Sequence, residues 1–122
     1  MPKFSHDGID LWFEVVGSGR RVLVFNGSGA TIETSRPLID ALASQCEVLV
    51  HDQRCLGRST IPVEQPSMAD YAADAQRLLD HVGWSSAAVF GMSFGGMVAQ
   101  EFAVTLARAG RASRSAVHLA GW

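Results

Sequence analysis

A serine lies in the middle of a Gly-x-Ser-x-Gly segment, Gly91-Met92-Ser93-Phe94-Gly95. Apolar residues that suit a buried strand come directly before it, at 87–90, and residues 95–103 suit a helix. A serine hydroxyl attacks a carbonyl carbon only if it is exposed, can lose its proton and lies beside donors for the oxyanion that forms. A sharp turn from strand to helix exposes the hydroxyl, and the two glycines leave room for that turn. A plain glycine and serine loop is the alternative, but the flanking elements favour Ser93 as a nucleophile.

Two backbone N–H groups are candidates for an oxyanion hole. The first belongs to Phe94, because a helix that begins after Ser93 directs its N-terminal N–H groups at the reaction centre. The second belongs to Ser28, in the glycine-rich segment Asn26-Gly27-Ser28-Gly29 that follows an apolar run at 22–25. By itself that segment is equally consistent with an ordinary turn at the end of a strand. The serine motif downstream favours the donor role, so we expect the N–H groups of Ser28 and Phe94 to form the oxyanion hole.

These residues must be positioned by an α/β arrangement, because short apolar runs alternate with longer helical stretches. Buried parallel strands are expected where the runs are apolar throughout, at 22–25, 48–50 and 87–90. Mixed apolar and polar positions at 9–16 instead predict an antiparallel edge strand. Helices are expected at 35–43, 67–82 and 95–103. Ser67 and Asp70 can form a capping box at the start of the second helix, and Gly83 ends it.

Three motifs in this order resemble those of the α/β-hydrolase superfamily over about residues 8–103. Residues 26–29 match its oxyanion segment, 51–59 its Asp-x-Arg-Gly-x-Gly-x-Ser stretch, and 88–99 its nucleophile elbow. The resemblance implies the N-terminal part of a doubly wound, mostly parallel sheet in three αβα layers, truncated after the elbow helix. It also implies a serine hydrolase with an acyl-enzyme at Ser93. Because the opening Asn26-Gly27 resembles the enol-lactonase and carboxylic-ester hydrolase branch, a small-molecule ester or lactone is the expected substrate.

In this family the acid and the histidine of the triad come well after the elbow, past the last residue of this chain. The four histidines are His6, His51, His81 and His118. His51, next to Asp52, is the one candidate for a base, but the resemblance makes this pair a support for a loop. Without a base, serine is a poor nucleophile at neutral pH, so we expect the isolated chain to be inactive. The alternative is a non-catalytic truncated product, or a binding or subunit module.

The segment after the elbow helix differs in composition. No acidic residue follows Glu101, and arginine recurs there among alanine, glycine and serine. A helix end with a basic surface is one interpretation. Read one base later, however, permitted codons for 105–122 can encode a helix end and a strand that resemble the family, so we hypothesise a frameshift near residue 105. We accordingly expect residues 1–104 to be the N-terminal part of the domain and 105–122 a tail, which leaves a sheet edge exposed to self-association.

Composition and charge restrict the remaining possibilities. The chain has 122 residues, 48% hydrophobic and 18% charged, which is typical of one soluble globular domain. A net charge of -2 gives no field that would attract nucleic acid or an anionic membrane. No apolar run suits a signal peptide or a membrane span, so we expect a cytoplasmic protein. Cys46 and Cys55 lack the spacing of metal or redox motifs, and neither a metal nor a cofactor is expected.

Overall fold

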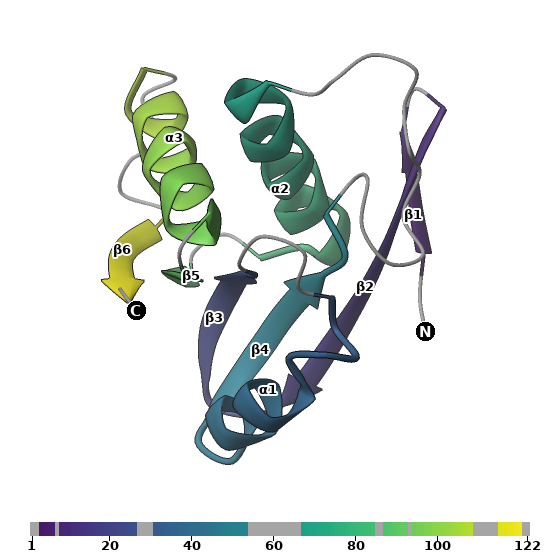
Figure 1. Cartoon of the computed structure of the whole chain (residues 1–122), viewed down its shortest axis with the longest axis vertical. Helices are drawn as coiled ribbons and strands as arrows, with labels where there is room; N and C mark the ends of the chain where they lie inside the picture. The colour runs from purple at the N-terminus through teal and green to yellow at the C-terminus, as the bar shows by residue number, and fades with distance from the viewer. Residues whose placement is uncertain are drawn as a thin grey trace.

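The structure is a computed structural model that describes residues 3–6, 8–26, 31–53, 67–84, 87–92, 94–108 and 115–120. Its sheet contains six strands in the order β1-β2-β4-β3-β5-β6 (Figure 1). The strands are β1 (Lys3–His6), β2 (Ile9–Gly17), β3 (Arg20–Phe25), β4 (Cys46–His51), β5 (Ala87–Met92) and β6 (Ser115–Ala120). The helices are α1 (Arg36–Ala43), α2 (Met68–Val82) and α3 (Phe94–Arg108).

Most of the sheet is parallel. β3 pairs in parallel with β4 and β5, and β5 does so with β6, whereas β2 is antiparallel to both β1 and β4. Parallel strands need a crossover connection, and one helix lies in each: α1 between β3 and β4, α2 between β4 and β5, and α3 between β5 and β6. The predicted α/β class with a mostly parallel sheet is therefore confirmed.

Helices cover both faces of the sheet. Along β3, Val22 and Val24 lie in a cluster with Ile39 of α1, while Leu23 and Phe25 lie in a second cluster with residues of α2 and α3. Neighbouring side chains of a strand point to opposite faces, so this alternation separates α1 from the other two helices. Figure 1 shows α2 and α3 next to each other and α1 apart from both. The expected three αβα layers are present, and they explain why residues 22–25 of β3 form an unbroken apolar run.

Both ends of α2 follow from local signals in the sequence. At its start the Ser67 hydroxyl accepts a hydrogen bond from the Asp70 N–H (3.2 Å), and the Asp70 carboxylate accepts one from the Ser67 N–H (2.8 Å). At its end Gly83 adopts a left-handed conformation (φ 78°), and the Trp84 N–H donates to the Leu79 carbonyl (3.0 Å). The predicted capping box and glycine stop are confirmed, and each satisfies backbone groups that a helix end leaves without partners.

Three strands differ from the prediction. β2 has the expected antiparallel direction, but β1 pairs with its outer side, so β2 does not lie at the edge. β1 has only four residues, too few for a recognisable pattern. β6 lies in the segment that was expected to form a tail, and Ala116, Val117 and Leu119 give it the apolar content of a strand that pairs with β5. The change of reading frame near residue 105 stays a hypothesis.

Candidate active site

The candidate active site lies where three strands end at the same edge of the sheet. The register pairs Phe25 of β3 with Gly91 of β5, and Val24 of β3 with Val50 of β4. Because the three strands are parallel, their carboxyl ends meet at one edge, which is where ligands bind in open α/β sheets. Asn26 directly follows β3 at this edge, and Met92 is the last residue of β5.

The predicted nucleophile belongs to this edge by its place in the chain. β5 ends at Met92 and α3 begins at Phe94, so Ser93 is the one residue between strand and helix. Ser93 itself lies outside the described residues, as does Ser28, which falls within 27–30. Their roles as nucleophile and oxyanion donor stay predictions. The Phe94 N–H is one of the first N–H groups of α3, which have no acceptor inside the helix.

Gly95 lets the first turn of α3 approach the end of β3. It is buried, and a Cβ atom built on it would lie 2.5 Å from the carbonyl oxygen of Asn26 and closer still to that of Phe25. A larger residue therefore fits only if α3 moves away from β3. Sequence analysis gave Gly91 and Gly95 the role of leaving room for a sharp turn. The structure adds a packing requirement at Gly95. Gly91 lies on β5 beside Phe25.

Asn26 and Gln53 form a buried polar contact at this edge. The Gln53 Nε2 donates a hydrogen bond to the Asn26 carbonyl oxygen over 3.1 Å, and both residues are almost completely buried. The Asn26 Nδ2 and the Gln53 Oε1 have no hydrogen-bond partner among the described residues. Sequence reasoning included Gln53 in the motif at 51–59 but gave it no role. The contact joins residues that are far apart in the chain, so no local pattern indicated it.

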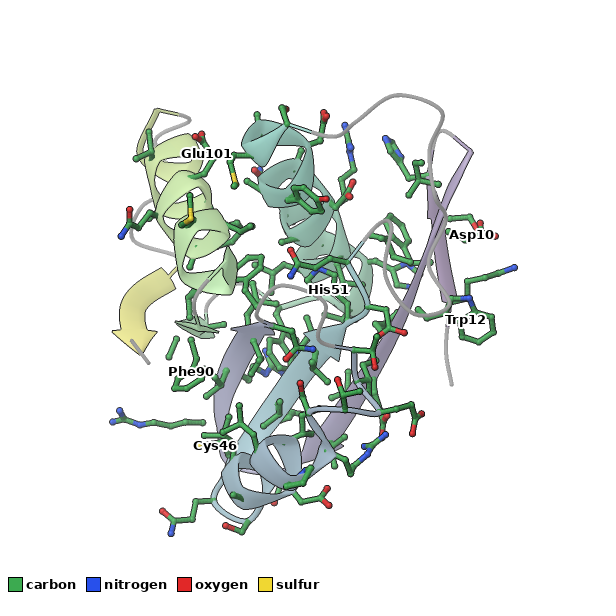
Figure 2. The ribbon with its side chains drawn as sticks, in the orientation of Figure 1. Asp10, Trp12, Cys46, His51, Phe90 and Glu101 are labelled. Carbon is green, nitrogen blue, oxygen red and sulfur yellow. The ribbon has the colours of Figure 1, made fainter. Side chains whose placement is uncertain are left out.

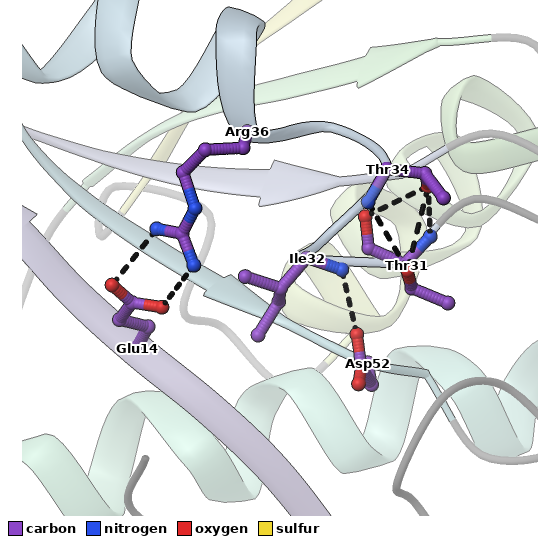
Figure 3. Close-up of polar contacts among 6 residues, drawn as sticks. All are labelled: Glu14, Thr31, Ile32, Thr34, Arg36 and Asp52. Carbon is purple, nitrogen blue, oxygen red and sulfur yellow. Dashed lines mark hydrogen bonds and ion pairs between the residues drawn. The ribbon is translucent and has the colours of Figure 1, made fainter.

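Asp52 holds the chain on the other side of the predicted oxyanion segment. It is buried, and its Oδ1 accepts a hydrogen bond from the Ile32 N–H over 2.7 Å, as Figure 3 shows. Its own N–H donates to the Trp12 carbonyl (2.8 Å), which continues the contact between β4 and β2 past the end of the strand. Asn26 and Ile32 are therefore held by consecutive residues, Gln53 and Asp52.

Further polar contacts fix the chain between Ile32 and α1 (Figure 3). The Thr31 N–H donates to the Thr34 hydroxyl (2.8 Å), and the Thr34 N–H donates to the Thr31 hydroxyl (3.3 Å). Arg36 then makes two hydrogen bonds of 2.9 Å each to the Glu14 carboxylate on β2. These hydrogen bonds lower the pKa of Glu14 and raise the pKa of Arg36, because each charge stabilises the other. The start of α1 is thus tied to β2.

His51 is enclosed at the end of β4 (Figure 2). It is 1% exposed, and its ring meets the Phe25 ring edge-on, with the centroids 5.9 Å apart. Burial lowers the pKa of His51 to about 4, although the charges of Asp74 and Asp52 act in the opposite direction. The imidazole is therefore uncharged at neutral pH, and its Nδ1 has no hydrogen-bond partner among the described residues. These properties favour a buried support over a base that meets substrate.

The other histidines with described side chains lie beside β1. His81, in the last turn of α2, packs against Phe4 (4.7 Å between ring centroids) and Phe13 (5.8 Å), and His6 is part of β1 itself.

In the part of the chain that the structure describes, no group of three or more His, Cys, Asp or Glu side chains could hold a metal ion. None of the described helices combines the length and the apolarity needed to cross a bilayer.

Comparison with known proteins gives consistent sequence matches, among them a family profile and a bacterial relative. The profile of the alpha/beta hydrolase fold family matches residues 20–109. A protein of Azorhizobium caulinodans named "Putative carbamate hydrolase RutD" is 33% identical over 120 residues, which are 98% of this chain and 44% of that protein. The chain thus spans less than half the length of this relative.

Solved structures have the same fold. MGS-M2, an alpha/beta hydrolase enzyme from a Medee basin deep-sea metagenome library, gives a TM-score of 0.86 at 18% identity, over 97% of this chain and 43% of its own. At that identity the likeness concerns the fold alone. Est816, described as an N-acyl homoserine lactone degrading enzyme, gives a TM-score of 0.78 at 25% identity, over 84% of this chain and 40% of its own.

Proposed function

We propose, since this chain belongs to the α/β-hydrolase family, that the whole protein is a serine hydrolase that cleaves a carboxylic ester or lactone through an acyl-enzyme at Ser93. The Ser93 hydroxyl loses its proton to a base and attacks the carbonyl carbon. The oxygen that becomes negative accepts hydrogen bonds from the N–H groups of Ser28 and Phe94. The alcohol group then leaves with a proton, and water hydrolyses the acyl-serine, which frees the acid and restores the hydroxyl.

One observation carries this proposal: a single residue, Ser93, separates the end of β5 from the start of α3. A strand, a sharp turn and a helix in this order are the context that the Gly-x-Ser-x-Gly pattern requires. The close approach of Gly95 to the carbonyl groups of Phe25 and Asn26 supports it, because it places the first turn of α3 next to Asn26, two residues before Ser28 in the sequence. The N-terminus of α3 contributes a partial positive charge that favours a developing oxyanion.

Two comparisons support a substrate with a reactive carbonyl carbon. The names of two similar proteins refer to a carbamate and to an N-acyl homoserine lactone. Both compound classes carry a carbonyl carbon bonded to a leaving group, which is what a serine nucleophile attacks. The resemblance of Asn26-Gly27 to the enol-lactonase and carboxylic-ester hydrolase branch leads us to place the ester or lactone first.

We assign the base and the acid of the triad to the rest of the whole protein. The chain spans only 40 to 44% of the similar proteins described above. His51 does not suit the role, because it is buried and its pKa of about 4 makes it a weak base. We therefore expect the 122-residue chain to turn over no ester on its own.

Labelling with an added base tests Ser93 directly. The chain is treated with a fluorophosphonate in the presence of imidazole, which can accept the serine proton as the histidine of a triad would. We expect an adduct on Ser93, found by mass spectrometry of peptides, that forms faster with imidazole than without it. Ser44→Ala, at an exposed serine, is the matched control and should label like the wild type.

The same assay decides against the proposal if the wild-type chain with imidazole labels no faster than Ser93→Ala. That outcome would favour a non-catalytic role for the chain. It would leave the family assignment unchanged, because that assignment rests on the sequence profile and not on reactivity.

A further inference from the structure

The carbonyl group of Asn26, just after β3, lies close to residues of two other parts of the fold, the chain after β4 and the first turn of α3. It accepts the 3.1 Å hydrogen bond from the Gln53 Nε2, beyond the end of β4. It also lies so close to Gly95 that a Cβ atom there would be 2.5 Å away. All three residues are buried. The place of this carbonyl is therefore set by Gln53 on one side and by the first turn of α3 on the other.

Chemistry fixes the orientation of the Gln53 amide. The Asn26 carbonyl oxygen can only accept a hydrogen bond, so the NH2 group of Gln53 must face it. A side chain of the same length without an N–H donor would leave a buried carbonyl without this partner. Methionine at position 53 meets this description, and leucine is a smaller side chain that also lacks a donor.

Asp52 makes the equivalent contact at the other end of the segment. Its carboxylate accepts the Ile32 N–H over 2.7 Å, and Ile32 is completely buried in the cluster on the α1 side of the sheet. Phe25, which precedes Asn26, belongs instead to the cluster on the side of α2 and α3. The two ends of the segment thus lie next to apolar clusters on opposite faces of the sheet. Two neighbouring side chains, those of Asp52 and Gln53, bind one end each.

We propose that Asp52 and Gln53 are positioning residues that hold Asn26 and Ile32, and with them the segment that carries the Ser28 donor. This inference rests on the proposed function, in which the Ser28 N–H is an oxyanion donor. A donor stabilises the transition state only when its position is correct to within about 0.5 Å. The hydrogen bond of Gln53 to Asn26 also fixes the Asn26 carbonyl relative to Gly95, and therefore relative to the first turn of α3.

Hydrogen exchange tests the two contacts without any need for activity. In the full 122-residue chain, peptides that span 26–35 should exchange about fivefold faster in Gln53→Met, because a buried neutral hydrogen bond is lost. The Ile32 amide should exchange about tenfold faster or more in Asp52→Ala, because its acceptor there is charged. Peptides from α2 should exchange at the wild-type rate, which verifies that each variant is folded. If Gln53→Met loses protection in α2 as well, the smaller Gln53→Leu, which also lacks a donor, replaces it.

Labelling of Ser93 with fluorophosphonate and imidazole tests the consequence for the reaction. We expect Gln53→Met to label about tenfold more slowly or more, since loss of a whole oxyanion donor lowers rates by about 10²–10³. Gln45→Met makes the same change at an exposed residue just before β4, at the opposite end of that strand, and should label like the wild type.

The outcomes separate this inference from the proposed function. If peptides that span 26–35 exchange at the wild-type rate in both Gln53 variants, the contact does not hold the segment, whatever the labelling rate of Ser93. Faster exchange with wild-type labelling overturns the positioning role, because the segment is then loosened without effect on Ser93. Failure of the wild-type chain to label faster than Ser93→Ala overturns the proposed function, and the exchange rates alone then decide whether the two residues hold the segment.

Discussion

At the scale of single residues, His51 makes the stability of the fold depend on pH. Its pKa is about 4 in the folded chain and 6.5 for an ordinary histidine, so the unfolded chain takes up a proton first as the pH falls. Stability should therefore decrease between pH 6.5 and about pH 4, by on the order of 3 kcal/mol for this group. Below that window both states are protonated, and His51 causes no further loss.

Urea denaturation at neutral pH and near pH 4 measures this effect. His51→Gln removes the titrating group, so the difference in unfolding free energy between the two conditions should become smaller than in the wild type. His6→Gln, on β1, is the matched control and should retain the wild-type difference. An equal pH dependence in His51→Gln and the wild type would show that another group is responsible.

Gly95 gives a second prediction at the residue scale. Gly95→Ala should lower the free energy of unfolding by about 3 kcal/mol, because the new methyl group meets two backbone carbonyl oxygens that cannot move independently of β3. Urea denaturation measures the loss. Gly8→Ala is the comparison, since Gly8 has a φ of 77° but open space around it, and only backbone strain of about 1 kcal/mol is expected. Similar losses at both glycines would contradict the packing role of Gly95.

At the scale of elements, the ion pair of Arg36 with Glu14 ties the start of α1 to β2. The two hydrogen bonds of 2.9 Å are parallel and partly buried, so the pair should be stronger than an exposed single contact. A double-mutant cycle with Arg36→Met and Glu14→Gln should give a coupling energy of about 1 kcal/mol at neutral pH. Arg36→Lys should keep only part of it, because an ammonium group cannot make both bonds in the same geometry. A coupling energy near zero would mean that α1 is placed by its apolar contacts alone.

The elements that the sequence predicted are those with strong local or doubly buried patterns. β3, β4 and β5 are covered on both faces, so each contains an unbroken apolar run. α2 has a capping box and a glycine stop, which act within a few residues. β1 was missed because four residues carry too little pattern, and β2 was placed at the edge because the chain gives no sign of a partner outside it.

Part of the candidate site could also be predicted, because some of its residues belong to a local turn. The types and order of Ser93, Phe94 and Gly95 follow from a local turn, so the sequence is sufficient to propose them. The role of Gln53 was not visible, since it depends on which strands are neighbours and on how their ends meet. His51 was considered as a base only because its burial, and hence its low pKa, cannot be read from the residues beside it.

At the scale of the whole molecule, the two outer strands of the sheet differ in their protection against other chains. β1 carries Lys3, which pairs with Asp10 at 3.6 Å, and charge of this kind discourages strand pairing at an edge. β6 contains no Lys, Arg, Asp or Glu, and no described strand pairs with its outer side. We propose that copies of this chain associate through the outer edge of β6.

Sedimentation velocity over a wide range of concentration should therefore show a mass above that of the monomer. Ser115→Lys combined with Ala120→Lys adds charge at the two ends of β6 and should return the chain toward a monomer, because repulsion and desolvation of lysine oppose pairing of the edges. Ser18→Lys combined with Gln45→Lys makes the same change in net charge at exposed positions away from this edge, so it separates a specific effect of β6 from a general gain in solubility. Equal dissociation in both double variants would point to net charge alone. A wild-type chain that stays monomeric throughout the range would contradict association through β6.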